Sequence, residues 1–361
     1  MPNKKNTRNP SGTGTIRKRS NGKWEVRYTA GYDTGIGKQI QKSIYGETQG
    51  EVSKKLRAIQ TSQDAGTYIE PSKMTLSEWL DIWSNDYLSS VKNSTVYSYK
   101  KHIENHIKPA LGAVKLQRLN LHDIQKLYNN LHKIKKLSPK TIKNLHGVLH
   151  SSLKQAVKIG YLFTNPSDSI TLPRIINPKI NPLPEFKISE FIKESEQDFY
   201  NIIFFVALFT GMRQGEVLGL TWDCINFKNK TILIEKQLQK DKITREYKLV
   251  SLKNDKPRTI TPAPLVMQKI KEQKIKQMEW KLQAGSGWNN HYNLVFTNEI
   301  GHYLSSLTVY NHYKKIVAKI GYPKLRFHDL RHTYAINALQ SGDDIKNPSR
   351  NFMTSHSRIY S

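Results

Sequence analysis

The chain has a single cysteine, Cys224, among its 361 residues. A lone cysteine excludes disulfides within the chain and any zinc site held by several thiolates. No apolar run approaches the roughly 20 residues that span a bilayer, and residues 1–6 lack the apolar core of a signal peptide. Acidic residues are few, and they form no cluster typical of a metal-dependent nuclease. We therefore expect a cytoplasmic protein with no cofactor, no metal and no membrane partner.

What the chain has in excess is positive charge. It contains 57 Lys and Arg against 29 Asp and Glu, a formal net charge of +28. Such an excess indicates a polyanionic partner and binding that weakens steeply as salt rises. An anionic membrane is the rival partner, but without a spanning segment nucleic acid is favoured.

Two breaks divide the chain into three expected domains. Residues 61–73 are polar and lack apolar periodicity. A second stretch carries five prolines, too dense for a helix or a central strand: Pro166, Pro173, Pro178, Pro182 and Pro184. Such a segment is an extended linker, which would let its flanking domains embrace something between them. We therefore expect domains at 1–62, 74–165 and 187–361, with a Pro-rich linker at 166–186.

The first domain is predicted to be a three-stranded β-sheet followed by a helix. Asn21-Gly22 is a strong hairpin signal, residues 24–28 and 38–44 alternate apolar with polar side chains, and a helix follows from about 49 to 60. One face would hold Trp24, Val26, Tyr28 and Ile40, and the other would hold the basic Arg17, Arg19, Arg27, Lys38 and Lys42. A basic sheet face can lie in a DNA major groove; the alternative is an ordinary solvated face.

The second domain is predicted to be all helical. Thr75 and Glu78 form a capping box, Asn120 and Ser138 cap further helices, and the helix after Ser138 carries a long apolar stripe. Lys140 and Lys143 crowd its first turn and predict a phosphate-binding patch. His102/His106 and His146/His150 are each four apart, a spacing that can hold a metal. Since neither pair has a third ligand or the His-Glu-x-x-His form, we interpret them as helix-face or DNA-side histidines.

The third domain is predicted to be mainly helical with a small antiparallel sheet. The apolar run 202–209 is expected to form a buried helix that Gly211 ends. Arg213 then falls in the first turn of the next helix, aimed away from the core, where Glu216 can orient its guanidinium. Strands are expected at 231–234, 247–250 and 258–260.

His328 and Arg331 lie three residues apart in the run Phe-His-Asp-Leu-Arg-His, and on a helix they would share one face. A guanidinium and an imidazole that converge suit a phosphodiester, because the first forms bidentate charge-assisted hydrogen bonds and the second carries protons. The alternative is that these are ordinary surface bases in a very basic chain.

Three motifs in this order resemble the tyrosine recombinases of the phage and conjugative-transposon integrase family, and the resemblance covers nearly the whole chain. Residues 210–222 match the family's first arginine motif, Lys253 with Arg258 matches its β-hairpin lysine, and residues 327–335 match its His-x-x-Arg box. The first domain resembles the arm-type DNA-binding domain of integrases, and the second resembles their helical, SAM-like core-binding domain. The resemblance implies a multidomain α+β protein.

The resemblance also implies a function, site-specific DNA recombination that integrates and excises a mobile element. In the family a tyrosine attacks the scissile phosphate and leaves a 3′-phosphotyrosyl link and a free 5′-hydroxyl, without ATP or metal. Arg213 and Arg331 would hold the non-bridging oxygens, Lys253 would protonate the leaving 5′-oxygen, and His328 would handle protons or bind the phosphate. The implied partners are double-stranded attachment-site DNA, a tetramer on that DNA, an excisionase and a DNA-bending host protein.

The C-terminal residues depart from the family pattern. No Leu-Gly-His box follows the His-x-x-Arg box, and Tyr360, the candidate nucleophile, lies 14 residues after Lys346 where about 18 are expected. His356 is a candidate for the missing histidine, and Tyr334 is expected to pack in the core. Two explanations stay open: a shortened tail that works, or a truncated or frameshifted, catalytically inactive chain that acts only as a sequence-specific DNA-binding protein.

Overall fold

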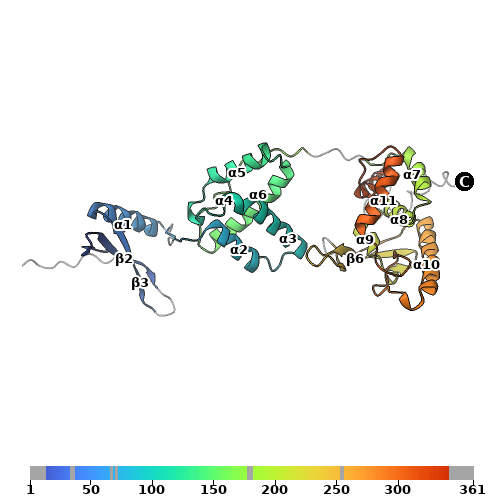
Figure 1. The fold of residues 1–361 in the computed structure, drawn as a ribbon, viewed down its shortest axis with the longest axis horizontal. Helices are drawn as coiled ribbons and strands as arrows, with labels where there is room; N and C mark the ends of the chain where they lie inside the picture. Colours follow the sequence, from blue (N-terminus) through green and yellow to red (C-terminus); the bar gives the residue numbers. More distant parts are fainter. Residues whose placement is uncertain are drawn as a thin grey trace, which may run out of the picture. The chain divides into compact units, whose positions relative to one another are not determined.

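The chain has a mixed helix-and-sheet fold, as predicted, and divides into two compact units, residues 1–175 and 176–361. Each unit is described below by itself (Figure 1). The computed structural model describes residues 14–32, 37–65, 68–69, 72–176, 182–252 and 256–340. Within these ranges no helix combines the length and the apolar character needed to cross a membrane.

The N-terminal part of the first unit is a small antiparallel sheet with one helix packed against it. Its strands pair in the order β1 (Thr15–Lys18), β2 (Trp24–Tyr32) and β3 (Gln39–Gly46), and α1 (Gln49–Asp64) follows. Gly22, with a φ of 82°, lies in the turn between β1 and β2, where the Asn-Gly pair predicts a hairpin. The core of this part is formed by Val26 and Tyr28 from the sheet with Val52 and Leu56 from the helix.

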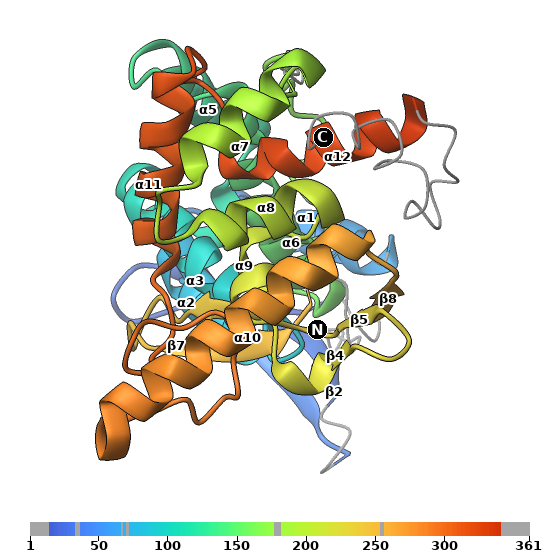
Figure 2. The same cartoon turned by 90° about the vertical axis from the view of Figure 1, so that its right-hand side faces the viewer.

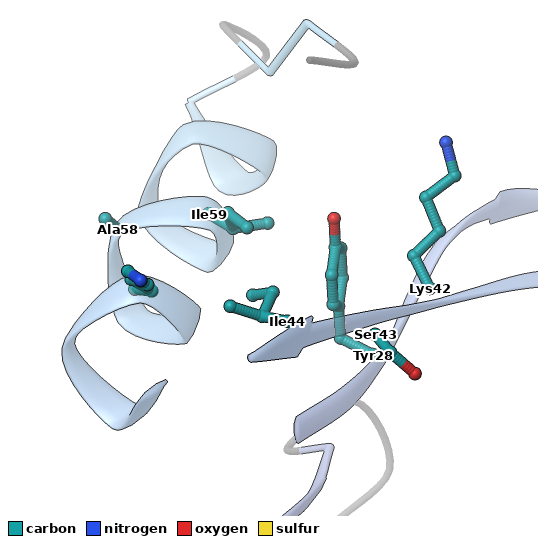
Figure 3. Close-up of a pocket in the computed structure, with 7 residues that line it drawn as sticks. Tyr28, Lys42, Ser43, Ile44, Ala58 and Ile59 are labelled. Atoms are coloured by element: carbon teal, nitrogen blue, oxygen red, sulfur yellow. The ribbon is translucent and has the colours of Figure 1, made fainter. Parts of the chain in front are cut away.

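Lys42 lies on a different face of this sheet from the one we predicted. Residues directly opposite in an antiparallel pair point to the same face, and Lys42 is opposite Tyr28. Lys42 therefore shares the α1 side of the sheet, and Figure 3 shows its side chain beside the Tyr28 ring. The prediction was wrong because residues two apart in a strand share a face, which places Lys42 with Ile44 and Ile40. Ile40 is 42% exposed and lies outside the core.

The rest of the first unit is helical, as predicted. Its helices are α2 (Leu76–Asp86), α3 (Asn93–His102), a π-helical turn (Ile103–Ile107), α4 (Lys108–Leu111), a 3₁₀ turn (Leu116–Arg118), α5 (Leu121–Lys133) and α6 (Pro139–Lys158). The capping box is present, because the backbone N–H of Glu78 donates to Thr75 Oγ1 at 3.3 Å and that of Thr75 donates to Glu78 Oε2 at 2.7 Å. The apolar stripe of α6 is buried, and Trp79 Nε1 donates to the Ser152 carbonyl at 3.1 Å, which ties α2 to α6.

The second unit is mainly helical around one large hydrophobic core. Its helices are a 3₁₀ turn (Glu185–Lys187), α7 (Ile188–Ser195), α8 (Asn201–Thr210), α9 (Gln214–Leu218), 3₁₀ turns at Trp222–Cys224 and Gly285–Gly287, α10 (Pro264–Ala284), α11 (Ser306–Lys319) and α12 (Phe327–Gln340). Helix α8 is buried from Ile203 to Thr210, as the apolar run predicts. Figure 2 shows α8 running between α10 and α12.

The strands of the second unit form two sheets. β4 (Ile225–Asn226), β5 (Thr231–Ile234) and β8 (Arg258–Ile260) make one antiparallel sheet, and β6 (Lys236–Lys240) pairs with β7 (Tyr247–Ser251) in a separate hairpin. The sequence prediction missed β6, whose five residues, Lys-Gln-Leu-Gln-Lys, contain one apolar side chain and therefore little alternation. Lys253 and Lys346–Ser361, with Tyr360 and His356, lie outside the described residues.

Candidate active site

The site is organised around Gly211, the residue that ends α8. Its φ of 63° is left-handed, a conformation that favours glycine, and its N–H donates to the Ala207 carbonyl at 3.1 Å. A Cβ added at this position would lie 2.4 Å from Cδ1 of Tyr334 on α12. Only glycine therefore allows both the turn and the close packing of α12. Tyr334 packs against the core of the unit, which confirms the prediction made for it.

Arg213 lies between this turn and α9. Its backbone N–H donates to Glu216 Oε2 at 3.0 Å, and its Nη1 donates to Glu216 Oε1 at 2.7 Å. The predicted orientation of Arg213 by Glu216 is therefore confirmed. The Arg213 side chain is 35% exposed, so its remaining N–H groups can reach a bound molecule.

Arg258 on β8 joins the same carboxylate, a contact that the sequence prediction missed. Its Nη1 donates to Glu216 Oε1 at 3.2 Å, and its Nη2 donates to Glu216 Oε2. Glu216 is 1% exposed. Burial raises the pKa of Glu216, but the hydrogen bonds from Arg258 and Arg213 outweigh it and hold that pKa below its ordinary value. The sequence signal for Arg258 was its place in the hairpin motif, five residues after Lys253.

Arg331 approaches these groups from α12. Its Nη1 donates to the backbone carbonyl oxygen of Gly211. Burial lowers the pKa of Arg331, as do the positive charges of Arg213 and Arg258 beside it. Three neighbouring guanidiniums therefore lie around the buried carboxylate of Glu216. This excess of positive charge is suited to binding an anion.

His328 lies one turn before Arg331 on the outside of α12. Its ring centroid is 5.0 Å from that of His332. Partial burial of the ring disfavours its charged form and so lowers the pKa of His328. The charges of His332, Arg331 and Arg213 lower this pKa further, while the charge of Asp329 raises it. At neutral pH His328 is therefore a neutral base that can accept a proton.

The glycines of the motif at 210–222 let β6 pack against α9. A Cβ at Gly219 would lie 2.4 Å from the backbone nitrogen of Leu238, and one at Gly215 would lie 3.1 Å from the carbonyl oxygen of the same residue. Larger residues would push the β6–β7 hairpin away from the helix that carries Glu216. The motif therefore supplies the glycines that allow β6 to pack closely on α9, in addition to Arg213.

The structure brings together Arg213, His328 and Arg331, as predicted, and adds Glu216 and Arg258 to them. The histidine pairs of the first unit have ring centroids 6.3 Å apart for His102–His106 and 5.4 Å apart for His146–His150. Among the residues that the structure describes, no three His, Cys, Asp or Glu side chains are placed to hold a metal ion.

The residues predicted to bind DNA lie at exposed or half-buried positions in the first unit. Lys140 and Lys143 are exposed near the N-terminus of α6. Lys38 is exposed just before β3, and Lys42 is half-buried on the α1 side of the sheet. Arg17, Arg19 and Arg27, the arginines of the first domain that were predicted to bind DNA, all contact the carboxylate of Glu25.

Comparison with known proteins shows the family of the chain. Residues 183–348 match the phage integrase family, and residues 75–132 match the N-terminal SAM-like domain of phage integrases. The chain is 32% identical over 359 residues to a tyrosine recombinase XerC-like protein of Caldanaerobacter subterraneus subsp. tengcongensis, covering 94% of this chain and 91% of that one. It is 24% identical to the ICEBs1 integrase of Bacillus subtilis, covering 91% and 89% of the two chains.

Two solved structures show the same fold. The Tn1549 transposon integrase in complex with a circular intermediate DNA has a TM-score of 0.65 at 20% identity, covering 80% of this chain and 93% of that one. A lambda integrase tetramer bound to a Holliday junction has a TM-score of 0.54 at 16% identity, covering 92% and 90%. Fold and site thus define a site-specific DNA recombinase, and the catalytically inactive alternative is not favoured. The chain belongs to the phage integrase family of tyrosine recombinases.

Proposed function

We propose that this recombinase integrates and excises a mobile element through a 3′-phosphotyrosyl intermediate, and that its arginines hold the scissile phosphate. The observation that carries the proposal is the convergence of Arg213, Arg258 and Arg331 around Glu216 and the Gly211 carbonyl. Phosphoryl transfer without a metal needs fixed cations on the non-bridging oxygens, where charge accumulates in the transition state. Three guanidiniums held by hydrogen bonds before DNA arrives meet this need.

Each residue then has a role in a balanced reaction. The tyrosine oxygen forms a bond to phosphorus while the bond to the 5′-oxygen breaks, and the leaving oxygen takes a proton to become a hydroxyl. Arg213 and Arg331 bind the non-bridging oxygens, and neutral His328 accepts the proton that the attacking tyrosine hydroxyl loses. Lys253 donates the proton to the 5′-oxygen, and Tyr360 is the nucleophile. These last two roles rest on the resemblance.

We also propose that three domains share the DNA, at 1–62, 74–165 and 187–361, joined by a linker at 166–186. The basic residues of the N-terminal sheet contact one site, and Lys140 and Lys143 contact another. A tetramer on DNA is supported by the lambda integrase structure, a tetramer bound to a Holliday junction. An excisionase and a DNA-bending host protein are proposed as accessory partners on the family resemblance.

A nicked attachment-site duplex tests the proposed chemistry, because the fragment with the free 5′-hydroxyl diffuses away and traps the covalent adduct. We expect the full-length chain to form an adduct that resists denaturation and that Tyr360→Phe eliminates without weakening DNA binding. Arg213→Ala should bind the duplex and form little adduct. An adduct that survives Tyr360→Phe would contradict the nucleophile assignment and redirect it to Tyr334. Tight binding with no adduct from the unaltered chain would support the inactive explanation.

A further inference from the structure

A buried carboxylate lies beneath the basic face of the N-terminal sheet. Glu25, the second residue of β2, is 1% exposed although it is charged. Arg17 Nε donates to Glu25 Oε2 at 2.8 Å, Arg19 Nε lies 3.1 Å from the same oxygen, and Arg27 Nε lies 3.5 Å from Oε1. One carboxylate thus contacts Arg17, Arg19 and Arg27, which we call the arginine cluster.

Neighbouring strands complete the surroundings of this carboxylate. Ser43 Oγ donates to Glu25 Oε1 at 2.7 Å, and the Tyr45 hydroxyl donates to the same oxygen at 3.4 Å. The register places Arg17 and Tyr45 directly opposite Glu25 on either side. The Arg19 guanidinium also lies 5.4 Å from the centre of the Tyr45 ring. The contacts therefore come from all three strands, on the face away from α1.

The arginine cluster remains available to a ligand despite these contacts. The side chains of Arg17, Arg19 and Arg27 are 49%, 42% and 51% exposed. A guanidinium has five N–H donors, and the contacts with Glu25 leave most of them free to point outward. Three positive charges against one negative charge also leave the cluster positive. It therefore keeps both the charge and the donors that DNA recognition requires.

The ion pairs involve an ionised carboxylate at neutral pH. The hydrogen bond from Ser43 lowers the pKa of Glu25, burial opposes it, and Arg17 lowers it further, to about 2. Glu25 is therefore ionised at neutral pH. Long arginine side chains lose conformational freedom when they become ordered, and Glu25 orders these before DNA binds.

We propose that Glu25 is a positioning residue that sets the geometry of the arginine cluster for sequence-specific contact with DNA. This inference rests on the proposed DNA-binding function of the N-terminal sheet and goes beyond it. A negative charge on a DNA-binding face weakens the attraction to phosphate. The Glu25 carboxylate under three arginines is explained if the geometry of these arginines matters more for DNA binding than the total positive charge, because that geometry allows discrimination between sequences.

The carboxylate could reduce the positive charge of the DNA-binding face, or it could position the arginine cluster. Replacement of the carboxylate separates these two effects, because they change the affinity for the preferred sequence in opposite directions. Glu25→Gln keeps the shape of the side chain and removes its charge. If the carboxylate only reduces the positive charge, the variant should bind every duplex more tightly. If it positions the arginine cluster, the variant should bind its preferred sequence more weakly while it binds unrelated DNA as well as before or better. We expect the ratio of specific to nonspecific affinity to fall by about tenfold, the range for loss of one bidentate hydrogen-bond pair with a base.

The experiment uses the full-length chain. Selection from a random duplex library by the unaltered chain, and in parallel by a variant with Arg17, Arg19 and Arg27 all changed to Ala, defines the sequence that depends on the arginine cluster. Affinities of the variants for that sequence and for a scrambled duplex then give the specificity ratio. Glu47→Gln is the matched control, because it removes one negative charge from an exposed side chain in the same domain, paired with Lys23 at 2.9 Å.

Each outcome decides the proposal. A ratio that falls for Glu25→Gln and stays constant for Glu47→Gln supports positioning. A ratio that is the same for both variants overturns it and leaves the DNA-binding function intact, whereas the absence of any arginine-dependent sequence overturns both. If Glu25→Gln does not fold, as judged by circular dichroism, Ser43→Ala takes its place. That variant removes one hydrogen bond to Glu25 and no charge, and positioning predicts a smaller fall in the same direction, while an unchanged ratio contradicts it.

Discussion

The guanidinium of Arg331 donates a hydrogen bond to the backbone carbonyl of Gly211, a residue 120 positions earlier in the chain. This contact joins the two arginine motifs, because Gly211 ends α8 and Arg213 follows closely after it. A backbone acceptor has a fixed position, so it holds the Arg331 guanidinium near that of Arg213. The pair therefore links the packing of α12 on α8 to the geometry of the anion site.

Gly211→Ala should destabilise the second unit and abolish cleavage. An alanine at positive φ costs about 1–2 kcal/mol, and the added Cβ, 2.4 Å from the Tyr334 ring, adds about 1–3 kcal/mol of overpacking. Gly321→Ala is the matched control, since Gly321 has a φ of 86° and no atom within 4 Å of an added Cβ. Thermal unfolding by calorimetry measures both variants. Equal losses of stability would show that the contact with Tyr334 carries no energy.

Arg213→Ala should slow cleavage far more than it weakens DNA binding. Removing one such interaction with a transition state costs about 2.7–4 kcal/mol, or a factor of about 10²–10³ in rate. Affinity should change by less than about tenfold because many phosphate contacts share the binding. Single-turnover cleavage and a titration with labelled duplex measure the two quantities. Lys281→Ala on the last turn of α10 removes the same charge and should leave the rate unchanged; parallel reductions in both variants would point to net charge alone.

Glu216→Gln should lower both stability and cleavage. The variant leaves Arg213 and Arg258 beside each other without a counter-charge. Removing one partner of a fully buried pair costs about 3–5 kcal/mol, and since both arginines are about one-third exposed, solvent screening reduces this to about 2 kcal/mol. Denaturant unfolding checks the stability. A variant as stable as the unaltered chain but slow in cleavage would assign Glu216 to positioning alone.

His328 should make the free protein less stable as pH falls below about 6.5, its ordinary pKa. Its pKa is lowered in the folded chain, so the unfolded state takes up this proton first. Between the folded pKa and 6.5 the free energy of unfolding then rises with pH, by at most about 1.4 kcal/mol per pH unit for one proton. Above 6.5 the effect vanishes. His328→Gln should lose this part of the slope in unfolding measured from pH 8 to pH 5, and two parallel curves would contradict the prediction.

Lys140→Ala combined with Lys143→Ala should reduce the salt dependence of DNA binding. If each lysine neutralises one phosphate of a duplex, removing both lowers the slope of log affinity against log salt by about 1.8. Lys154→Ala combined with Lys158→Ala removes two exposed lysines from the same helix, nearer its C-terminal end, and serves as the control. Fluorescence anisotropy at several salt concentrations measures both slopes. Equal reductions would show that the N-terminal end of α6 is not a special DNA-binding position.

The sequence by itself determined the features that depend on close neighbours in the chain. The capping box at Thr75, the glycine that ends α8 and the pairing of Arg213 with Glu216 each join residues no more than four apart. A helix or a turn brings such residues together whatever the rest of the protein does. The sequence of β3 was also sufficient to place Lys42. A strict period of two assigns Lys42 to the same face of the sheet as Ile40 and Ile44, which is the correct face.

Only the tertiary structure decided which distant groups meet. Arg258 reaches Glu216 across 42 residues, Arg331 reaches Gly211 across 120, and Glu25 gathers side chains from three strands. These contacts depend on how α12 packs on α8, how β8 pairs with β5, and which register β2 takes with its neighbours. Packing and register arise from the fit of whole faces against one another. No short window of sequence contains that fit, so the motifs named Arg213 and Arg331 while the fold determined which distant groups they meet.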